Sequence, residues 1–277
     1  MKILFFALIS IFAFTDNYNQ LTMDKFKSSQ SIDGFSFVIM GDNRSGNNIL
    51  KKIISKTDRD NDIKFLINNG DLVPDGYKNE YSEYLHIIQI SNKPIISIIG
   101  NHEIPWYDGK TNYKNLFGET NFSFFFANSY FIILDSADNK ISTKQFNWLE
   151  NELQKSQRYT NRFVISHVPL YDPRNGNYQK GHSLNRVEEA RKLNNLFDQY
   201  GVTMFFGSHI HSYFRGYWHK TPYIITGGAG APLKKNGFYH YIKVIINGKD
   251  IKYKIIKIDT QKPSAIEVII KEIKDFL

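Results

Sequence analysis

Short apolar runs alternate with helical patterns along most of the chain. Continuous apolar runs are typical of strands that are covered on both faces of a sheet, whereas apolar residues spaced by three and four mark one face of a helix. The expected strands are residues 35–40, 64–68, 94–100, 122–135 (two strands around a short turn), 162–166 and 203–207. The expected helices lie around 49–54, 77–88, from 142 onward and over 186–200.

Two stretches carry the signal of a helix N-terminus, and one carries the signal of a hairpin. Ser142 and Gln145 form a capping box, and Ser264 and Glu267 form a second one before an apolar helical face near the end of the chain. Between them, the last third is mostly β and closes with a hairpin that turns at 247–248, an Asn-Gly pair suited to a tight turn. We therefore expect an α/β fold that ends in a β-hairpin and a helix.

The N-terminal residues differ from the rest of the chain. One lysine is followed by an apolar stretch from Ile3 to Phe14. A membrane-spanning helix needs about 20 apolar residues, so this stretch is short for an anchor and typical of a signal peptide. The sequence predicts a signal peptide over 1–15, a polar linker over 16–33 and one domain over 34–277. An uncleaved amphipathic anchor and a buried N-terminal strand remain alternatives.

The composition of the chain mainly excludes certain kinds of site and partner. The chain has no cysteine, which excludes disulfides, zinc–thiolate sites and thiol nucleophiles and suits an exported protein. The net charge is +8, but the basic residues are 27 lysines and 8 arginines, a bias that an AT-rich genome produces by itself. No segment shows the arginine clusters or basic–aromatic interleaving of a nucleic-acid groove. We therefore do not expect the chain to bind nucleic acid. The positive electrostatic field of the protein favours small anionic substrates.

Five polar clusters directly follow the expected strands, where open α/β sheets bind their ligands. Taken singly, each has an ordinary explanation as a turn or a helix cap. Taken together, they gather carboxylate oxygens, an amide oxygen and imidazole nitrogens, which suit divalent Mn, Fe, Zn or Co ions. The clusters are GDN at 41–43, NGD at 69–71, GNHE at 100–103, SHVP at 166–169 and GSHIH at 207–211.

The ordered series of clusters resembles the calcineurin-like metallophosphoesterase superfamily, whose pattern is D-x-H, G-D, G-N-H-E/D, H and G-H-x-H. The resemblance spans residues 37–215, and GGAG at 227–230 also fits it. It implies a sandwich of two mixed β-sheets flanked by helices, with two divalent metal ions (Mn, Fe or Zn) in loops at one edge. It also implies a phosphoric ester hydrolase in which a metal-bound hydroxide attacks a small phosphorylated substrate.

The resemblance also implies a role for individual residues of this chain. Asp71 would bridge both metals, and Asp42 and His211 would complete one site. His102 would lie near the leaving-group oxygen as a general acid or charge stabiliser, and Glu103 could orient it. The remaining ligands, which would complete the other site, are Asn101, His167 and His209.

Two positions depart from the family pattern, Arg44 and Ser208. Arg44 stands where the family often has the histidine of D-x-H, and a guanidinium does not bind metals, so the Asp42/His211 site is expected to be weak. Purple acid phosphatases also lack that histidine, but they have a tyrosine three residues after the bridging aspartate. This chain has Pro74 there, so we do not expect it to be one of them. Ser208 replaces the usual glycine in GHxH.

Arg44 also raises a hypothesis about the substrate. We expect its guanidinium to bind the substrate phosphate as a bidentate clamp. The alternatives are a surface arginine that caps the following helix or pairs with Asp58 or Asp62. Residues 43–45 form an N-glycosylation sequon, and a glycan there would block the site. The sequence therefore favours an exported bacterial protein, periplasmic or extracellular, over a eukaryotic secreted one.

Two other functions remain open from the sequence. One is a nucleotide-directed phosphodiesterase or nucleotidase, which uses the same chemistry. The other is a catalytically degenerate relative that binds a phosphorylated ligand without turnover. His182, in the long loop 168–185, could line the substrate mouth or belong to plain surface structure. The natural substrate, the choice between monoester and diester, and the oligomeric state do not follow from the sequence.

Overall fold

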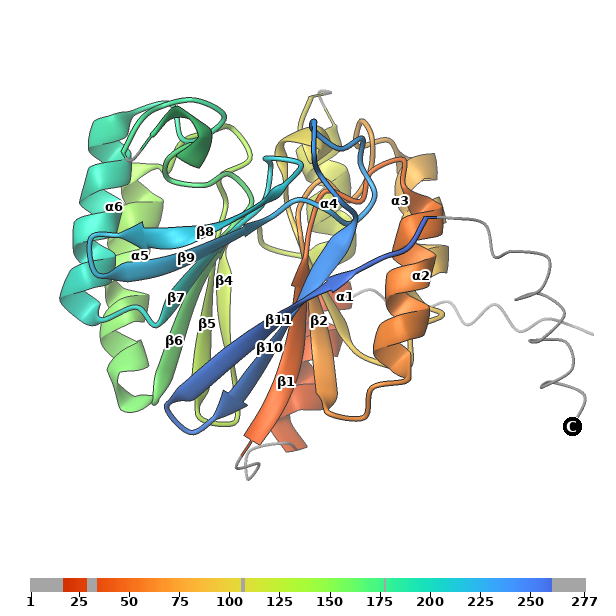
Figure 1. Ribbon diagram of the computed structural model, residues 1–277, viewed down its shortest axis with the longest axis horizontal. Coiled ribbons are helices and arrows are strands. Elements are labelled where there is room, and N and C mark those ends of the chain that lie inside the picture. Colours follow the sequence, from red (N-terminus) through yellow and green to blue (C-terminus); the bar gives the residue numbers. More distant parts are fainter. Residues whose placement is uncertain (1–16, 29–33, 106–107, 177, 261–277) are drawn as a thin grey trace, which may run out of the picture.

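Two β-sheets pack face to face, with helices on their outer sides, in the computed structural model of the chain (Figure 1). The structure describes residues 17–28, 34–105, 108–176 and 178–260. The expected fold, a sandwich of two mixed sheets flanked by helices, is confirmed. The helices are α1 (Tyr18–Asp24), α2 (Asn47–Asp58), α3 (Lys78–Ile88), α4 (Gly109–Phe117), α5 (Thr143–Lys155) and α6 (Val187–Tyr200).

The first sheet holds five strands and the second holds six. The first consists, in spatial order, of β11 (Asp250–Lys257), β10 (His240–Asn247), β1 (Gly34–Met40), β2 (Ile63–Asn69) and β3 (Ile95–Ile98). The second consists of β4 (Phe122–Phe126), β5 (Ser129–Leu134), β6 (Asn161–Ser166), β7 (Met204–Gly207), β9 (Thr221–Thr226) and β8 (Tyr213–Trp218). The strands β1, β2 and β3 are parallel, as are β5, β6, β7 and β9. Their carboxyl ends therefore lie along one edge of the sandwich, where the polar clusters follow them.

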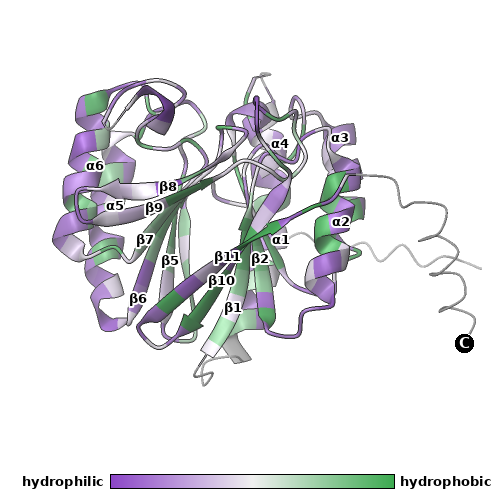
Figure 2. Cartoon of the chain, viewed as in Figure 1, coloured by the Kyte–Doolittle hydropathy of each residue, from purple (hydrophilic) through white to green (hydrophobic). Residues whose placement is uncertain are grey.

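The core explains why most of the strands are apolar throughout, β8 and β11 being partly exposed exceptions. Phenylalanine side chains fill the space between the sheets, and the rings of Phe37 and Phe65 stack 5.5 Å apart. Opposite side chains of the same strands, such as Val38 and Leu66, pack under the outer helices. In Figure 2 β1 and β2 are largely green, β11 carries purple bands, and α5 and α6 carry purple outer surfaces. A strand that is buried on both faces has no solvated positions, so it lacks polar alternation.

The start of α5 confirms half of the expected capping box. The Ser142 side chain accepts a hydrogen bond from the Gln145 backbone N–H. The Gln145 side chain does not return to Ser142: its oxygen accepts from the Asp135 N–H, and its amide donates to the Asp135 carbonyl. Gln145 therefore ties α5 to the end of β5. The second expected capping box, at residues 264–267, and the helix after it lie outside the described residues.

The expected linker over 16–33 is wrong for residues 17–28, which fold onto the first sheet. Asn17 caps α1, and a 3-10 turn at Lys25–Ser28 follows it. Asn19 is buried and pairs with the backbone of Ser97, donating to its carbonyl at 2.8 Å and accepting from its N–H at 2.9 Å. This pairing satisfies both backbone groups of Ser97 on the edge strand β3. The expected signal peptide lies outside the described residues.

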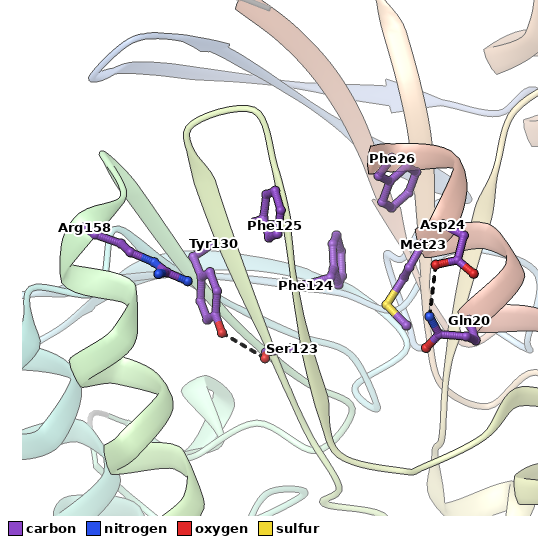
Figure 3. A pocket seen from close by; sticks show the side chains of 9 residues that line it. All are labelled: Gln20, Met23, Asp24, Phe26, Ser123, Phe124, Phe125, Tyr130 and Arg158. Atoms are coloured by element: carbon purple, nitrogen blue, oxygen red, sulfur yellow. Dashed lines mark hydrogen bonds between the residues drawn. The ribbon is translucent and has the colours of Figure 1, made fainter. Parts of the chain in front are cut away.

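A side hollow of about 320 Å³ lies between α1 and the β4–β5 hairpin (Figure 3). Met23, Phe26 and Phe124 give it an apolar lining, and Arg158 lies at its rim. It contains none of the residues that the sequence proposes for catalysis. In the part of the chain that the structure describes, no helix is both long and apolar enough to cross a bilayer.

Candidate metal centre

Three of the proposed ligands lie in sharp turns at the edge where the parallel strands end. The backbone φ angles of Asp42, Asp71 and His209 are 61°, 54° and 68°. These values lie in the left-handed region, which residues other than glycine rarely adopt. Such a conformation costs about 1–3 kcal/mol and persists where the surroundings impose it, often at a functional site. The Asp42 and Asp71 loops are joined by their backbones, because Arg44 N–H donates to the Asp71 carbonyl.

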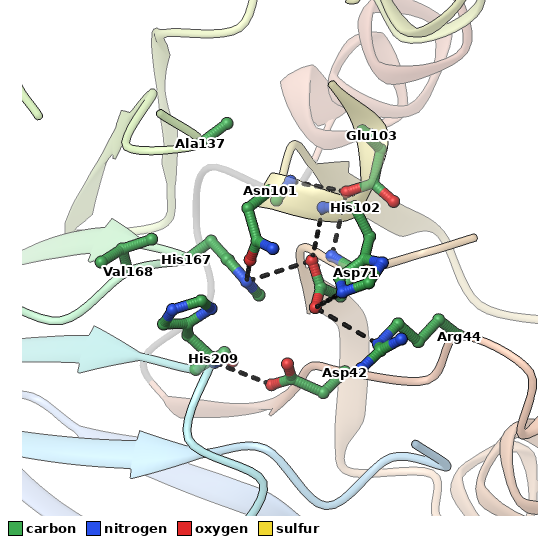
Figure 4. A network of polar contacts seen from close by, with 12 residues as sticks. Asp42, Arg44, Asp71, Asn101, His102, Glu103, Ala137, His167, Val168 and His209 are labelled. Carbon is green, nitrogen blue, oxygen red and sulfur yellow. Dashed lines mark hydrogen bonds and ion pairs between the residues drawn. The ribbon is translucent and has the colours of Figure 1, made fainter. Parts of the chain in front are cut away.

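The structure brings the predicted ligands together in two groups that share one carboxylate. The donor atoms of each group lie within 4.8 Å of one another. The His167 Nε2 lies 3.2 Å from the Asp71 Oδ1 and 3.0 Å from the Asn101 Oδ1, and Figure 4 shows these three side chains converging. One group is Asp71, His167 and His209, and the other is Asp42, Asp71 and His211; all are buried.

Backbone carbonyls orient two of the histidine rings. The His167 Nδ1 lies 2.8 Å from the Asn69 carbonyl oxygen, and the His211 Nδ1 lies 2.7 Å from that of Pro232. An Nδ1–H that donates to a carbonyl leaves the Nε2 lone pair facing the centre, the arrangement common among metal-binding histidines.

Burial and neighbouring charges set the protonation of these rings. Burial, with the neighbouring histidines His167 and His182, lowers the pKa of His209 to about 2, so this ring is neutral and can act as a ligand. Burial opposes a charge on His167, but the Asp71 carboxylate beside it raises its pKa to about 10. A proton held between these two groups occupies the place of a cation. A divalent ion that binds there would displace the proton, so metal affinity rises with pH.

The carboxylates also fit a pair of cations. Asp42 is fully buried; its Oδ2 accepts from the His209 backbone N–H, but its Oδ1 has no hydrogen-bond partner and lies 3.4 Å from the His211 Nε2. A buried carboxylate oxygen without a partner is costly unless it binds a cation. The shared position of Asp71 suits an oxygen donor that bridges two ions. The residues present therefore fit a centre of two divalent metals.

The GGAG segment closes the other side of the Asp42 loop. Ala229 and Ala231 donate to the carbonyls of Gly41 and Asp42 at 3.0 and 2.7 Å. A Cβ at Gly227 would lie 2.8 Å from the Asp42 Oδ2, so glycine is needed for this close approach. The segment is a passage from β9 into a loop that supports the centre.

The structure corrects the role of Glu103. Its buried carboxylate does not contact the His102 ring; it accepts hydrogen bonds from four backbone N–H groups. The donors are those of Asp71, Leu72, Val73 and Gly100, at 3.0, 2.7, 3.0 and 2.6 Å. The ring of His102 is oriented instead by the Pro74 carbonyl, 2.6 Å from its Nδ1. Glu103 therefore holds the loop that carries the shared carboxylate.

His102 and Arg44 lie on the same side of Asp71 (Figure 4). The His102 Nε2 is 3.9 Å and the Arg44 Nε is 3.6 Å from the Asp71 Oδ2. The Arg44 Nε is buried without a hydrogen-bond partner, although the side chain is 25% exposed. The alternative partners of Arg44 are engaged elsewhere: Asp58 bonds to Ser91, and Asp62 lies 3.5 Å from the Lys243 Nζ.

Comparison with known proteins identifies the family. The family model described as calcineurin-like phosphoesterase matches residues 35–213, more than half of the chain. The chain therefore belongs to the calcineurin-like phosphoesterase family.

One protein of similar sequence and two solved structures of similar fold illustrate the comparison. "Purple acid phosphatase 5" of Arabidopsis thaliana is 28% identical over 176 residues, which cover 62% of this chain and 41% of that protein. The solved purple acid phosphatase PPD1 of yellow lupin (Lupinus luteus) has a TM-score of 0.65 at 18% identity, covering 80% of this chain and 51% of that one. GAP50, the anchor in the inner membrane complex of Plasmodium, has a TM-score of 0.56 at 14% identity, covering 83% and 91%. At these identities the two solved structures show a shared fold.

These relatives do not support the expectation that the chain stands apart from purple acid phosphatases. The Arabidopsis and lupin relatives are named purple acid phosphatases. This chain nevertheless has Pro74 at the position where we expect purple acid phosphatases to have a tyrosine. Here the backbone of Pro74 orients His102, and the position offers no phenol oxygen to a metal. The matched region spans less than half the length of the Arabidopsis protein, so the activity of the whole relative is not transferred directly.

Proposed function

We propose that this chain is an exported, metal-dependent phosphoesterase that hydrolyses small phosphate esters. The observation that carries the proposal is the pair of buried donor groups that share Asp71. Export rests on the apolar N-terminal stretch of the sequence alone. Mn, Fe or Zn ions suit the mixture of carboxylate, amide and imidazole donors.

Each metal would have its own set of side chains. Asp42, Asp71 and His211 would hold one ion, and because Arg44 supplies no ligand, this site is the weaker. When bound, the two ions draw charge from the phosphoryl oxygens and make a water molecule more acidic. The ligands of the other ion would be Asp71, Asn101, His167 and His209.

His102 would serve the leaving group. Its Nδ1 faces the Pro74 carbonyl, and its Nε2 faces the centre near Asp71. When both nitrogens carry protons, the Nε2 can donate one to the departing alkoxide oxygen. The ring cannot turn away without losing the hydrogen bond at Nδ1, so the donor is already oriented.

Arg44 would bind the phosphoryl group. Its guanidinium is permanently charged and extends from the buried Asp71 carboxylate toward solvent, with an Nε that lacks a hydrogen-bond acceptor. A phosphoryl oxygen at the centre would supply that acceptor. Two parallel N–H donors match the geometry of two phosphate oxygens.

The test is hydrolysis of an aryl phosphate monoester and of its bis-aryl diester by the purified chain. We expect chelator-treated protein to lose turnover, and Mn²⁺ or Zn²⁺ to restore it. Asp71→Asn should remain inactive with either metal, while Asp60→Asn, at the opposite end of β2, should behave as the unchanged protein. The ratio of the two rates will define the substrate class.

A second variant separates an enzyme from a binding protein. His102→Ala should lower kcat by about 10²–10⁴-fold, the usual contribution of a general acid, and leave orthophosphate binding intact. Protein that binds metal and orthophosphate but hydrolyses neither ester would contradict the proposed function. The chain would then be a ligand-binding relative.

A further inference from the structure

The loop between β6 and α6 places a histidine directly on a proposed metal ligand. The rings of His182 and His209 are stacked, with centroids 3.7 Å apart and planes 5° apart. His209 is buried, whereas His182 is exposed. Because His182 is exposed and His209 is buried, the His182 ring covers His209 on the side that faces solvent.

One buried carboxylate fixes the position of His182. The side chain of Asp172 is 1% exposed and accepts the His182 backbone N–H at 2.7 Å. It also accepts the Arg174 backbone N–H at 3.0 Å, and the Nε and Nη2 of Arg174 at 2.9 and 2.7 Å. A Cβ at Gly181 would collide with the same carboxylate, so the chain approaches as closely as glycine allows. Asp172 thus joins the two sides of the loop.

The base of the loop is anchored separately. The Tyr171 ring packs on Trp218 at 5.4 Å, and the Tyr178 hydroxyl accepts from the His219 backbone N–H at 2.8 Å. Leu184 N–H donates to the Pro169 carbonyl at 3.0 Å. None of these contacts uses the Asp172 side chain. The loop base should therefore remain folded when Asp172 is replaced, and only the part that carries His182 should loosen.

We propose that Asp172 is a positioning residue that holds His182 against His209, where the imidazole contacts the phosphoryl group of the substrate. This inference rests on the proposed function. Arg174 takes part as the partner that keeps Asp172 charged and oriented. Without the Asp172 carboxylate, the backbone N–H of His182 has no acceptor. The loop then regains conformational freedom, and this gain in entropy favours separation of the two stacked rings.

A double-mutant cycle tests whether Asp172 acts through His182. His182→Ala should lower kcat by about 100-fold, the size expected when a hydrogen bond to a charged phosphoryl group is lost in the transition state. Asp172→Ala should lower kcat by about 10-fold in the unchanged protein and by less than about twofold in the His182→Ala background. Asp60→Ala, which breaks a 2.6 Å ion pair with Lys243 at the other end of the molecule, should change kcat little in either background. Independent, multiplying effects of Asp172→Ala and His182→Ala would overturn the proposal.

Hydrogen exchange gives a readout that does not require turnover. In the metal-loaded protein, Asp172→Ala should speed exchange of the amides at 174–176 and 178–183 and leave those of β6 and α6 unchanged. Unchanged exchange in the loop would overturn the proposal. If Asp172→Ala loosens the whole domain, Asp172→Asn keeps the volume of the side chain while removing its charge, and the same comparison applies. Turnover that survives His182→Ala would remove this inference and leave the phosphoesterase proposal standing. An inactive unchanged protein would remove the phosphoesterase proposal and, with it, the contact of His182 with substrate; hydrogen exchange would still show whether Asp172 holds the loop.

Discussion

At the scale of the residue, a substitution of Arg44 tests whether its guanidinium binds the substrate phosphate. Arg44→Ala should raise KM by about 10- to 100-fold, because a hydrogen bond to a charged group contributes about 1.5–3 kcal/mol. Binding of the metal by Asp71, His167 and His209 should change little, since a guanidinium is not a ligand. Steady-state kinetics with calorimetric metal titration checks both. Arg59→Ala, at the end of α2, is the matched control, and an unchanged KM for Arg44→Ala would rule out the clamp.

A substitution of Glu103 tests how much its carboxylate stabilises the loop that carries Asp71. Glu103→Gln should lower the free energy of unfolding by about 2–3 kcal/mol, because an amide NH2 then faces backbone donors that have no other acceptor. Denaturant unfolding measures this loss. Glu152→Gln is the control: Glu152 is also buried, but it accepts from the hydroxyls of Ser123 and Tyr130, which can rotate. Equal losses in the two variants would show that the four N–H donors have no special importance.

At the scale of the element, α1 belongs to the folded domain. Asn19→Ala removes both hydrogen bonds to the Ser97 backbone and leaves the buried Ser97 N–H without an acceptor, while the Ser97 carbonyl keeps the hydrogen bond from the Tyr113 hydroxyl. We expect a loss of about 2–3 kcal/mol in unfolding free energy by denaturant titration. Gln20→Ala is the control, because the Gln20 side chain bonds within the helix to Asp24. If the Asn19 variant is as stable as the Gln20 variant, α1 is not a stabilising part of the first sheet.

The elements show what local pattern can and cannot predict. Apolar runs predicted the strands, because burial on both faces leaves a signal within each segment. Polar clusters after those strands predicted which side chains gather at the candidate centre, because parallel strands end at one edge. The pattern missed α1, whose Asn19 acts on a residue 78 positions away. It also misassigned Glu103, since the number of backbone donors around a carboxylate depends on how loops meet in space.

At the scale of the whole molecule, the centre joins the two sheets. Asp42 and Asp71 follow strands of the first sheet, while His167 and His209 follow strands of the second. Ions bound there should therefore stabilise the entire sandwich, by about 3–4 kcal/mol at 100 to 1,000 times the dissociation constant.

Thermal unfolding with and without chelator measures this effect. We expect Mn²⁺ or Zn²⁺ to raise Tm of the unchanged protein, and to leave Tm of Asp71→Asn nearly unaffected. Asp60→Asn should respond to metal as the unchanged protein does. A Tm that is the same with and without metal would mean that the ions do not bind across the sheets.

The support of His211 by the Pro232 carbonyl has a consequence for the order of events during synthesis. The donors and their supports extend from Asp42 to Pro232, so a growing chain cannot complete the centre until most of the sequence has been made. A metal that binds the complete centre would therefore do so only after the chain has been made as far as Pro232. Sites of this type select ions partly by what the surroundings supply. The compartment in which these residues fold would then decide which metal the centre binds.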